Sequence, residues 1–454
     1  MQIKNYILSI TTAVALSTSG NYLAAQETEF KPSGNLWGQV FGDFANKAHN
    51  DTLQRGGSVQ YKGTTPLSSG NAITASNPTP NAVSNQTNAF QIRRMYLGYD
   101  YQFAPNFSAN IVLANEQNVD GTGKNTVFLK YANVKWSNIF KLKNTDLVLG
   151  QYATCAFATA GNTDGLWSYR SIEKTIMDMH GIDASTDLGA SLQGKMWSQR
   201  VPDSMKPAFI GYAFQVGNNN GAIPNASNYK KGRVNLYVIL LKQKLTIGVY
   251  GDYVVQQLTP YKTDNKTFKV YAAYKAGRFR IGAEIFKQTN ENSDIYQATS
   301  NGVVLPGAAN YTSSGVQIGW SVFASGKIVK NKLNVFARMD MYNPNTKFDK
   351  NSAYSKAYAG ISGYDSFGKL NPTTTFYTQT FYTAGIDWTP NPRMHLMPNI
   401  WYNGYNTMMS TTKPGGAGGD LSPRVKSDND LVYRLTFFFI FNGSKKVGGN
   451  GMND

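Results

Sequence analysis

Residues 431–441 read LVYRLTFFFIF, and this stretch carries the pattern that decides the fold. On one face of an extended chain stand only apolar residues: Leu431, Tyr433, Leu435, Phe437, Phe439 and Phe441. On the other face stand Val432, Arg434, Thr436, Phe438 and Ile440. The run is too short for a transmembrane helix, which needs about 20 apolar residues. A strand with lipid outside and a polar interior explains the asymmetry, although a buried strand of a soluble sheet can read similarly.

The same period-two alternation recurs along the whole chain. It is clear in segments 107–113, 245–253, 279–285 and 333–341, where one face is apolar and the other carries most of the polar residues. We expect strands to start near Asn35, Ala89, Phe107, Thr126, Asp146, Asp187, Pro207, Gly232, Leu245, Thr267, Arg278, Ser314, Lys332, Thr375, Arg393 and Asn429. The sequence therefore predicts an all-β fold, a transmembrane antiparallel β-barrel of about sixteen strands.

The connections between these strands differ systematically in length. Segments 104–106, 242–244, 276–277 and 389–392 are tight turns, whereas 48–87, 158–186, 289–312, 343–374 and 406–427 are long. Short and long links tend to alternate, as a barrel with periplasmic turns and longer outer loops requires. A soluble β-rich exported protein is the alternative, but it has no reason to sort its loops in this way.

The N-terminus predicts export. Lys4 supplies the positive charge of an n-region, and residues 6–16 form a short apolar h-region. Small residues at 24–25 precede Gln26, so residues 1–25 form a predicted signal peptide. We expect the barrel to span 26–441 and a polar periplasmic tail to span 442–454. The formal net charge is +17, but export argues against nucleic acid as a partner and favours outer-membrane lipid, lipopolysaccharide and anionic solutes.

Catalytic and metal-binding motifs are missing from the sequence. The three histidines, His49, His180 and His395, have no ligand spacing, and no G-x-S-x-G elbow occurs. The single cysteine, Cys155, cannot form an intramolecular disulfide. We therefore expect no cofactor, no metal and no enzymatic activity. A Ser–His pair on an outer rim remains open as an alternative.

The third outer loop, 158–186, follows the fifth strand and has a predicted helical patch at 171–179. A loop of this length inside a water-filled barrel can satisfy its backbone and narrow the channel. Its charged residues and the polar face of the wall give the candidate pore-lining and constriction set: Arg94, Lys135, Arg170, Glu173, Lys174, Asp178, Lys195, Arg280, Arg338 and Arg434.

Several short stretches resemble the phosphate-selective porin O and P family. They are segment 88–98 with its arginine pair, 149–152, 169–174, 187–194 and the NG turn within 215–221. The resemblance implies a sixteen-stranded trimeric porin of the outer membrane whose third loop folds into the lumen. The phosphate-coordinating residues of that family have no position-by-position match here.

These observations predict an outer-membrane porin that lets small hydrophilic solutes diffuse passively, with a mild preference for anions and phosphate as one candidate. Wall bases outnumber wall acids only slightly, so the expected field is weak. Two alternatives remain open. One is a non-transport barrel, either a rim enzyme or an adhesion or assembly component that uses its long loops. The other is a sugar-preferring porin.

Overall fold

A computed structural model of the chain describes residues 30–49, 51, 87–116, 126–159, 161–198, 208–224, 228–257, 262–300, 303–304, 310–347, 361–364, 375–410 and 427–441. The predicted signal peptide, 1–25, and the predicted tail, 442–454, lie outside the described residues. Among the described residues, no helix is long and apolar enough to cross a membrane.

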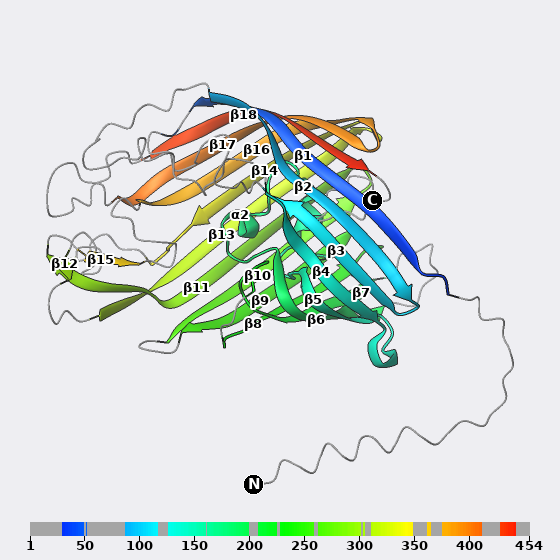
Figure 1. The fold of residues 1–454 in the computed structure, drawn as a ribbon. Helices are drawn as coiled ribbons and strands as arrows, with labels where there is room; N and C mark the ends of the chain where they lie inside the picture. The colour runs from blue at the N-terminus through cyan, green and yellow to red at the C-terminus, as the bar shows by residue number, and fades with distance from the viewer. Residues whose placement is uncertain are drawn as a thin grey trace, which may run out of the picture.

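Sixteen long antiparallel strands close into a barrel (Figure 1). They are β1 (Ser33–His49), β2 (Thr87–Ala104), β3 (Phe107–Asn115), β4 (Phe128–Ser137), β5 (Thr145–Ala153), β6 (Thr186–Ser198), β7 (Phe209–Gly217), β8 (Lys231–Leu240), β9 (Leu245–Gln257), β10 (Thr263–Ala276), β11 (Phe279–Ser300), β13 (Asn310–Val329), β14 (Leu333–Asn343), β16 (Thr375–Asn391), β17 (Met394–Ser410) and β18 (Ser427–Phe441). Two short strands, β12 (Val303–Val304) and β15 (Ile361–Tyr364), lie beside β11. The predicted fold class is confirmed.

The barrel closes where β18 pairs with β1, from Phe441 opposite Gly38 to Leu431 opposite His49. Its alternation matches the prediction, because Tyr433, Leu435, Phe439 and Phe441 are exposed, whereas Val432, Thr436 and Phe438 are buried. Apolar side chains of the other strands are exposed in the same alternating way, for example Ile247 and Val249 on β9. The outer surface is therefore apolar, as a barrel in lipid requires.

Aromatic rings follow one another at one end of the outer surface. Tyr99, Tyr101 and Phe103 of β2 stack in sequence, and Phe107 of β3 continues the row to Trp136 of β4. The 3-10 helix η1 (Ile139–Lys141) adds Phe140 against Trp136. Such rows are typical of the membrane–water interface, where amphipathic rings are favoured.

Two β-bulges change which side chains face inward. Phe41 pairs with Arg94 while Gly42 pairs with Ile92, so Arg93 is an extra residue and both arginines are buried. On β4, Tyr131 pairs with Val112 while Leu129 pairs with Leu113, so Lys130 is the extra residue. Strict alternation along β4 would turn Lys130 toward lipid, but the bulge shifts the alternation by one residue and Lys130 is buried.

The helical patch expected at 171–179 is also mostly wrong. The connection between β5 and β6 contains two short helices, α1 (Thr163–Trp167) and α2 (Ile176–Met179). The side chain of Asn162 accepts a hydrogen bond from the N–H of Thr163 and caps α1. Only the last four residues of the predicted patch are helical.

The closed hydrogen-bond ladder predicts high resistance to detergent. We expect the protein to resist SDS at room temperature and to shift its gel mobility on boiling, because no strand edge is open to the denaturant. Circular dichroism should show a β-rich spectrum before boiling. A heat-insensitive band together with a helix-rich spectrum would contradict the barrel.

Candidate functional site: the β5–β6 segment and a polar cavity

Residues 154–185 join β5 to β6 and are called here the β5–β6 segment. Most of its described side chains are buried, including Cys155, Phe157, Trp167, Ile172 and Ile176. Helix α1 contacts β11 and helix α2 contacts β13, so the segment reaches strands far from its own in the sheet. A buried segment of irregular backbone needs hydrogen-bond partners for its carbonyl and N–H groups.

The arginine pair of β2 supplies some of these partners. The Nη1 of Arg93 donates to the carbonyl oxygen of Ile172 at 2.5 Å. The Nη1 of Arg94 donates to the carbonyl oxygen of Arg170 at 2.8 Å. Both guanidinium groups also lie near the Glu173 carboxylate, at 3.5 and 3.6 Å. The bulge in β2 therefore brings two adjacent arginines onto one turn of the segment.

Basic side chains from distant strands hold the same segment. The Nζ of Lys269 on β10 donates to the carbonyl oxygen of Ala156 and to the side chain of Asn162. The Nη1 of Arg280 on β11 donates to the carbonyl oxygen of Leu166 at 3.1 Å. The Nη1 of Arg338 on β14 donates to the carbonyl oxygen of Lys174 at 2.5 Å. The segment is thus attached both to β2 and to strands that lie five to eight places from β2 around the closed sheet.

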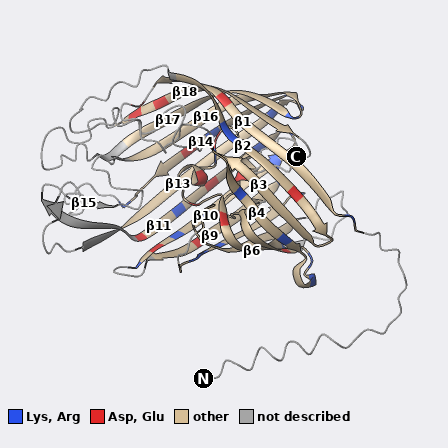
Figure 2. Ribbon diagram, viewed as in Figure 1, with Lys and Arg blue, Asp and Glu red and all other residues tan. Residues whose placement is uncertain are grey.

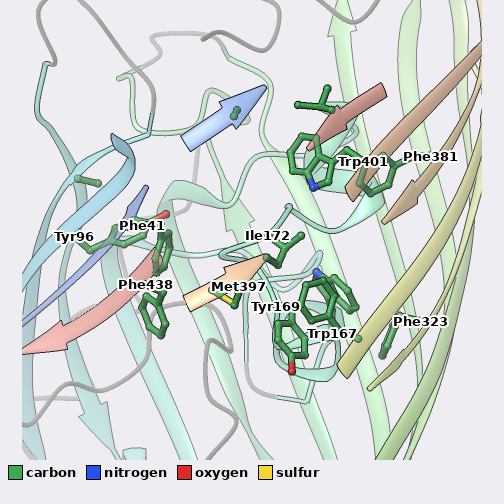
Figure 3. Close-up of a cluster of buried hydrophobic side chains, with 14 of the residues drawn as sticks. Phe41, Tyr96, Trp167, Tyr169, Ile172, Phe323, Phe381, Met397, Trp401 and Phe438 are labelled. Carbon is green, nitrogen blue, oxygen red and sulfur yellow. The ribbon is translucent and has the colours of Figure 1, made fainter. Parts of the chain in front are cut away.

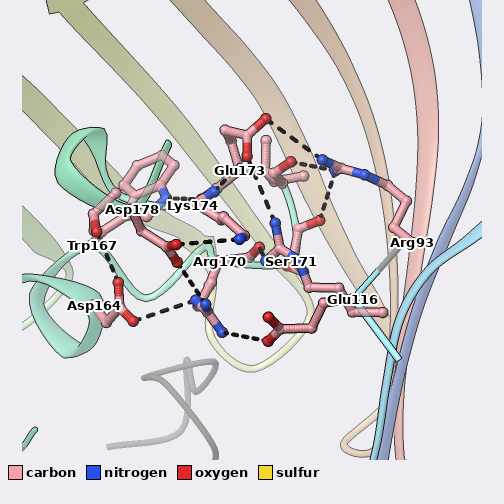
Figure 4. A network of polar contacts seen from close by, with 12 residues as sticks. Arg93, Glu116, Asp164, Trp167, Arg170, Ser171, Glu173, Lys174 and Asp178 are labelled. Atoms are coloured by element: carbon pink, nitrogen blue, oxygen red, sulfur yellow. Dashed lines mark hydrogen bonds and ion pairs between the residues drawn. The ribbon is translucent and has the colours of Figure 1, made fainter. Parts of the chain in front are cut away.

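Arg170 is the centre of a buried ionic network within the segment (Figure 4). Its Nη2 donates to Oδ2 of Asp178 at 2.7 Å, and it lies 3.3 Å from Asp164 and 3.9 Å from Glu116. Burial by itself would raise the pKa of Asp178, but the charges of Lys174 and Arg170 outweigh burial and hold it below its ordinary value.

A second ionic cluster fixes the end of the segment that leads into β6. Arg233 of β8 donates from Nε and Nη2 to the two oxygens of Asp183, at 2.7 and 2.9 Å, and from Nη1 to Asp187. Lys231 lies 3.2 Å from Asp183, and the Tyr250 hydroxyl also donates to it. Burial would raise the pKa of Asp183, but Arg233 and Lys231 hold it well below its ordinary value.

An aromatic cluster packs the opposite side of the segment (Figure 3). Trp167 lies 5.6 Å from Phe323 of β13, and Tyr169 lies 4.4 Å from Phe336 of β14, measured between ring centroids. Inward-facing residues complete the cluster, among them Phe41, Phe381, Met397, Trp401 and Phe438. The segment is therefore held by apolar packing as well as by hydrogen bonds.

A polar cavity of about 950 Å³ lies beside this packed region. Its inward-facing lining comes from β1 to β8 and from the start of the β5–β6 segment, and it includes Asn35, Asp100, Gln102, Ser108, Asn110, Asn133, Lys135, Asp146, Ser191, Gln193, Lys195 and Thr159. Two lysines and two aspartates balance in charge, and most of the other polar groups are amides and hydroxyls. Figure 2 shows acidic and basic residues interspersed along the strands of the barrel.

The predicted site residues fall into three groups. The structure brings together Arg94, Arg170, Glu173, Lys174, Asp178 and Arg338, and Arg280 joins them through α1. Lys135 and Lys195 line the cavity instead. Arg434 does neither, because it donates to Asp43 at 2.5 Å and lies 3.9 Å from the centre of the Trp401 ring.

Sequence reasoning missed Arg93 and the inward side chain of Lys130. Lys130 donates to Glu116 at 2.7 Å and to the hydroxyl of Ser185 at 2.9 Å, so it holds the far end of the β5–β6 segment. Two adjacent arginines in a strand were the one available signal, since strict alternation would place one of them in lipid. Among the described residues, no three His, Cys, Asp or Glu side chains could hold a metal ion.

No protein-family model matches the chain, and no curated protein matches it. Solved structures do resemble it. The outer membrane channel DcaP of Acinetobacter baumannii has 11% identity and a TM-score of 0.51, covering 90% of this chain and 97% of that one. The anion-selective porin from Comamonas acidovorans has 12% identity and the same TM-score of 0.51, covering 90% and 100%. At this identity the likeness shows the fold, the closed porin-like barrel.

We predict that Arg170→Met destabilises the barrel by about 3–5 kcal/mol, because it leaves Asp164, Asp178 and Glu116 without their shared cation in a buried place. Urea unfolding in detergent, followed by gel mobility, gives the measurement. The control is Lys266→Met, since the Lys266–Glu291 pair is exposed to solvent and its loss should change stability much less. Equal effects of the two substitutions would show that the network does not hold the segment.

The lowered pKa values of Asp178 and Asp183 predict how attachment of the segment depends on pH. Carboxyls with a lowered folded-state pKa stabilise fully above their ordinary pKa of about 3.9 and lose this as pH falls through the folded value. The protection factors of residues 164–183 against hydrogen exchange should therefore stay constant from about pH 8 to about pH 5 and fall only below about pH 4. Loosening near neutral pH would contradict this. Burial raises the pKa of Asp164, so this carboxyl changes stability with pH in the direction opposite to Asp178 and Asp183. The Asp164→Asn variant removes the contribution of Asp164 and leaves those of the other two.

Proposed function

We propose that the chain is an outer-membrane channel for passive diffusion of small hydrophilic solutes, exported through the signal peptide at residues 1–25. The closed barrel, its apolar outer surface and its polar interior cavity support this function. The fold likeness to an outer-membrane channel and a porin is in keeping with it. We place outer-membrane lipid and lipopolysaccharide around the barrel.

The β5–β6 segment acts in this proposal as the third outer loop, folded into the lumen as the constriction. The observation that carries the proposal is that inward-facing side chains of β2, β10, β11 and β14 all hydrogen-bond to this one segment. A segment lying outside the barrel could not reach strands on such different parts of the wall. The ionic network of Arg170 keeps its shape fixed.

The route of the solute follows from the uneven filling of the interior. The aromatic cluster around Trp167 takes residues from β13 to β18, from β10 and from β1 to β4. The polar cavity is lined by residues of β1 to β8 and of the β5–β6 segment. Hydrophilic solutes keep their hydrogen bonds along the cavity lining, so in this proposal Lys135 and Lys195 face the path while Arg434 does not.

The charge preference of the channel is mild and favours anions. Arg94, Arg170, Arg338 and Arg434 each lie beside a carboxylate, so little of their charge acts on a passing ion. Lys195, by contrast, is exposed in the cavity and has no ion pair among the described residues. We keep phosphate as a candidate solute without a dedicated site, and we propose a homotrimer from the family resemblance.

Deleting residues 163–178 tests the constriction. We expect stepwise conductance of the reconstituted protein in planar bilayers, and larger steps together with passage of larger solutes for the deletion variant. Deleting residues 413–423, from the connection between β17 and β18, is the control and should leave conductance unchanged. Unchanged conductance in the 163–178 variant, with an intact barrel, would place the segment outside the path.

Lys195→Gln tests the charge preference. We expect the reversal potential in a potassium chloride gradient to show mild anion selectivity for the wild type and less for this variant, since a charge acts over about 8 Å at physiological salt. Lys244→Gln, in the β8–β9 turn, makes the same charge change away from the cavity and should have no effect. A cation-selective wild type would mean that the segment's carboxylates dominate.

A further inference from the structure

The lining of the polar cavity carries one negative charge on β2 and one positive charge on β6 that are not paired with each other. Asp100 on β2 is half-buried; its Oδ1 accepts a hydrogen bond from Asn110 at 2.7 Å, and its Oδ2 has no hydrogen-bond partner within the described residues. No cation is paired with this carboxylate among those residues. Lys195 on β6 lies with its Nζ 4.4 Å from the centre of the Phe209 ring and likewise has no ion pair there.

The charges between these two sides neutralise each other. Lys135 on β4 and Asp146 on β5 form an ion pair at 3.7 Å. Amide side chains fill the remaining wall, with Asn110 opposite Asn133 on β3 and β4, and Gln193 opposite Asp146 on β6. Each amide side chain offers a donor and an acceptor, which is the hydrogen-bonding complement of a peptide group.

We propose that this cavity binds short zwitterionic peptides, with the ammonium end toward Asp100 and the carboxylate end toward Lys195. The proposal rests on the channel function above and names a solute class for it. An inorganic anion would use only one of the two unpaired charges. A saccharide would need exposed aromatic faces, whereas the rings of Tyr131 and Tyr152 are buried, and Tyr237 lies against Gly211.

The spacing of the two charges indicates the length of the peptide. β2 and β6 are separated in the sheet by β3, β4 and β5. The ladder sets Asp100 level with Gly189 of β6, and Lys195 lies six residues further along that strand. Four strand spacings of about 4.8 Å and six residues of about 3.4 Å give a path along the wall of roughly 28 Å. The straight line across the lumen is shorter than this path, so an extended peptide of about six to eight residues spans the two charges. The cavity volume of about 950 Å³ falls in the range of ligand pockets.

The test measures block of ion current through the full-length protein in planar bilayers. Peptides of glycine and serine, two to eight residues long, are added in four forms: unmodified, N-acetylated, C-amidated, and blocked at both ends. We expect the unmodified form of about seven residues to block at about fivefold lower concentration than either singly charged form. Two-residue peptides should lose this advantage because they cannot reach both charges.

Two variants test which end of the peptide lies at which charged residue. Asp100→Asn should remove the advantage over the N-acetylated form, and Lys195→Gln should remove the advantage over the C-amidated form. Glu291→Gln, on β11 away from the cavity, and Lys244→Gln are the charge-matched controls and should keep both advantages. Gel mobility before and after boiling confirms that each variant folds.

Equal block by all four forms, or unchanged block in both cavity variants, would overturn the proposal. Stronger block by a five-unit maltose oligomer than by any peptide would also overturn it and point to saccharides. These outcomes are distinct from a failure of the channel function itself. A protein that gives no conductance steps in potassium chloride contradicts the channel, whereas one that conducts without peptide block contradicts the peptide site alone.

Discussion

Closure of the sheet is the constraint on which the rest of the structure depends. In a bilayer each backbone N–H and C=O group needs a partner within the protein, and a closed ladder supplies one for every strand. Pairing of β18 with β1 therefore fixes the register of the first and last strands against each other. That register sets Asp43 opposite Thr436 and beside Arg434, so the inward arginine of the final strand has its counter-ion on the first strand.

Neutralisation of charge inside the barrel follows from the same constraint. Side chains that cannot point into lipid must point inward, where a buried charge is costly unless it is paired. Arg338 pairs with Asp340, Arg233 with Asp183, and Lys269 with Glu284. The formal net charge of +17 therefore does not describe the interior. Exposed lysines in the turns carry much of it, including Lys242, Lys244, Lys330 and Lys332.

The interior charges mainly attach the β5–β6 segment to the wall. Backbone carbonyl groups of the segment accept hydrogen bonds from arginines and a lysine, and its carboxylates face further cations. The aromatic cluster then adds apolar packing on one side, which polar contacts alone do not provide. The cluster takes residues from β1 to β4, β10 and β13 to β18, and the polar cavity is lined from β1 to β8, so the two share part of the wall.

The sequence by itself determined the strands, their two faces and the approximate strand starts, because lipid on one side and polar groups on the other impose a period of two that is local along the chain. It also indicated that the connection after the fifth strand is exceptional and that Arg94, Arg170 and Asp178 belong together with it. It could not give the inward position of Arg93 or Lys130, since a β-bulge leaves no periodic trace. Only the tertiary structure decided which charges pair, as between Arg434 and Asp43, because partners separated by most of the chain are brought together by closure of the barrel. The aromatic cluster around Trp167 was likewise a tertiary result, since it depends on how one segment packs against strands that are remote from it in sequence.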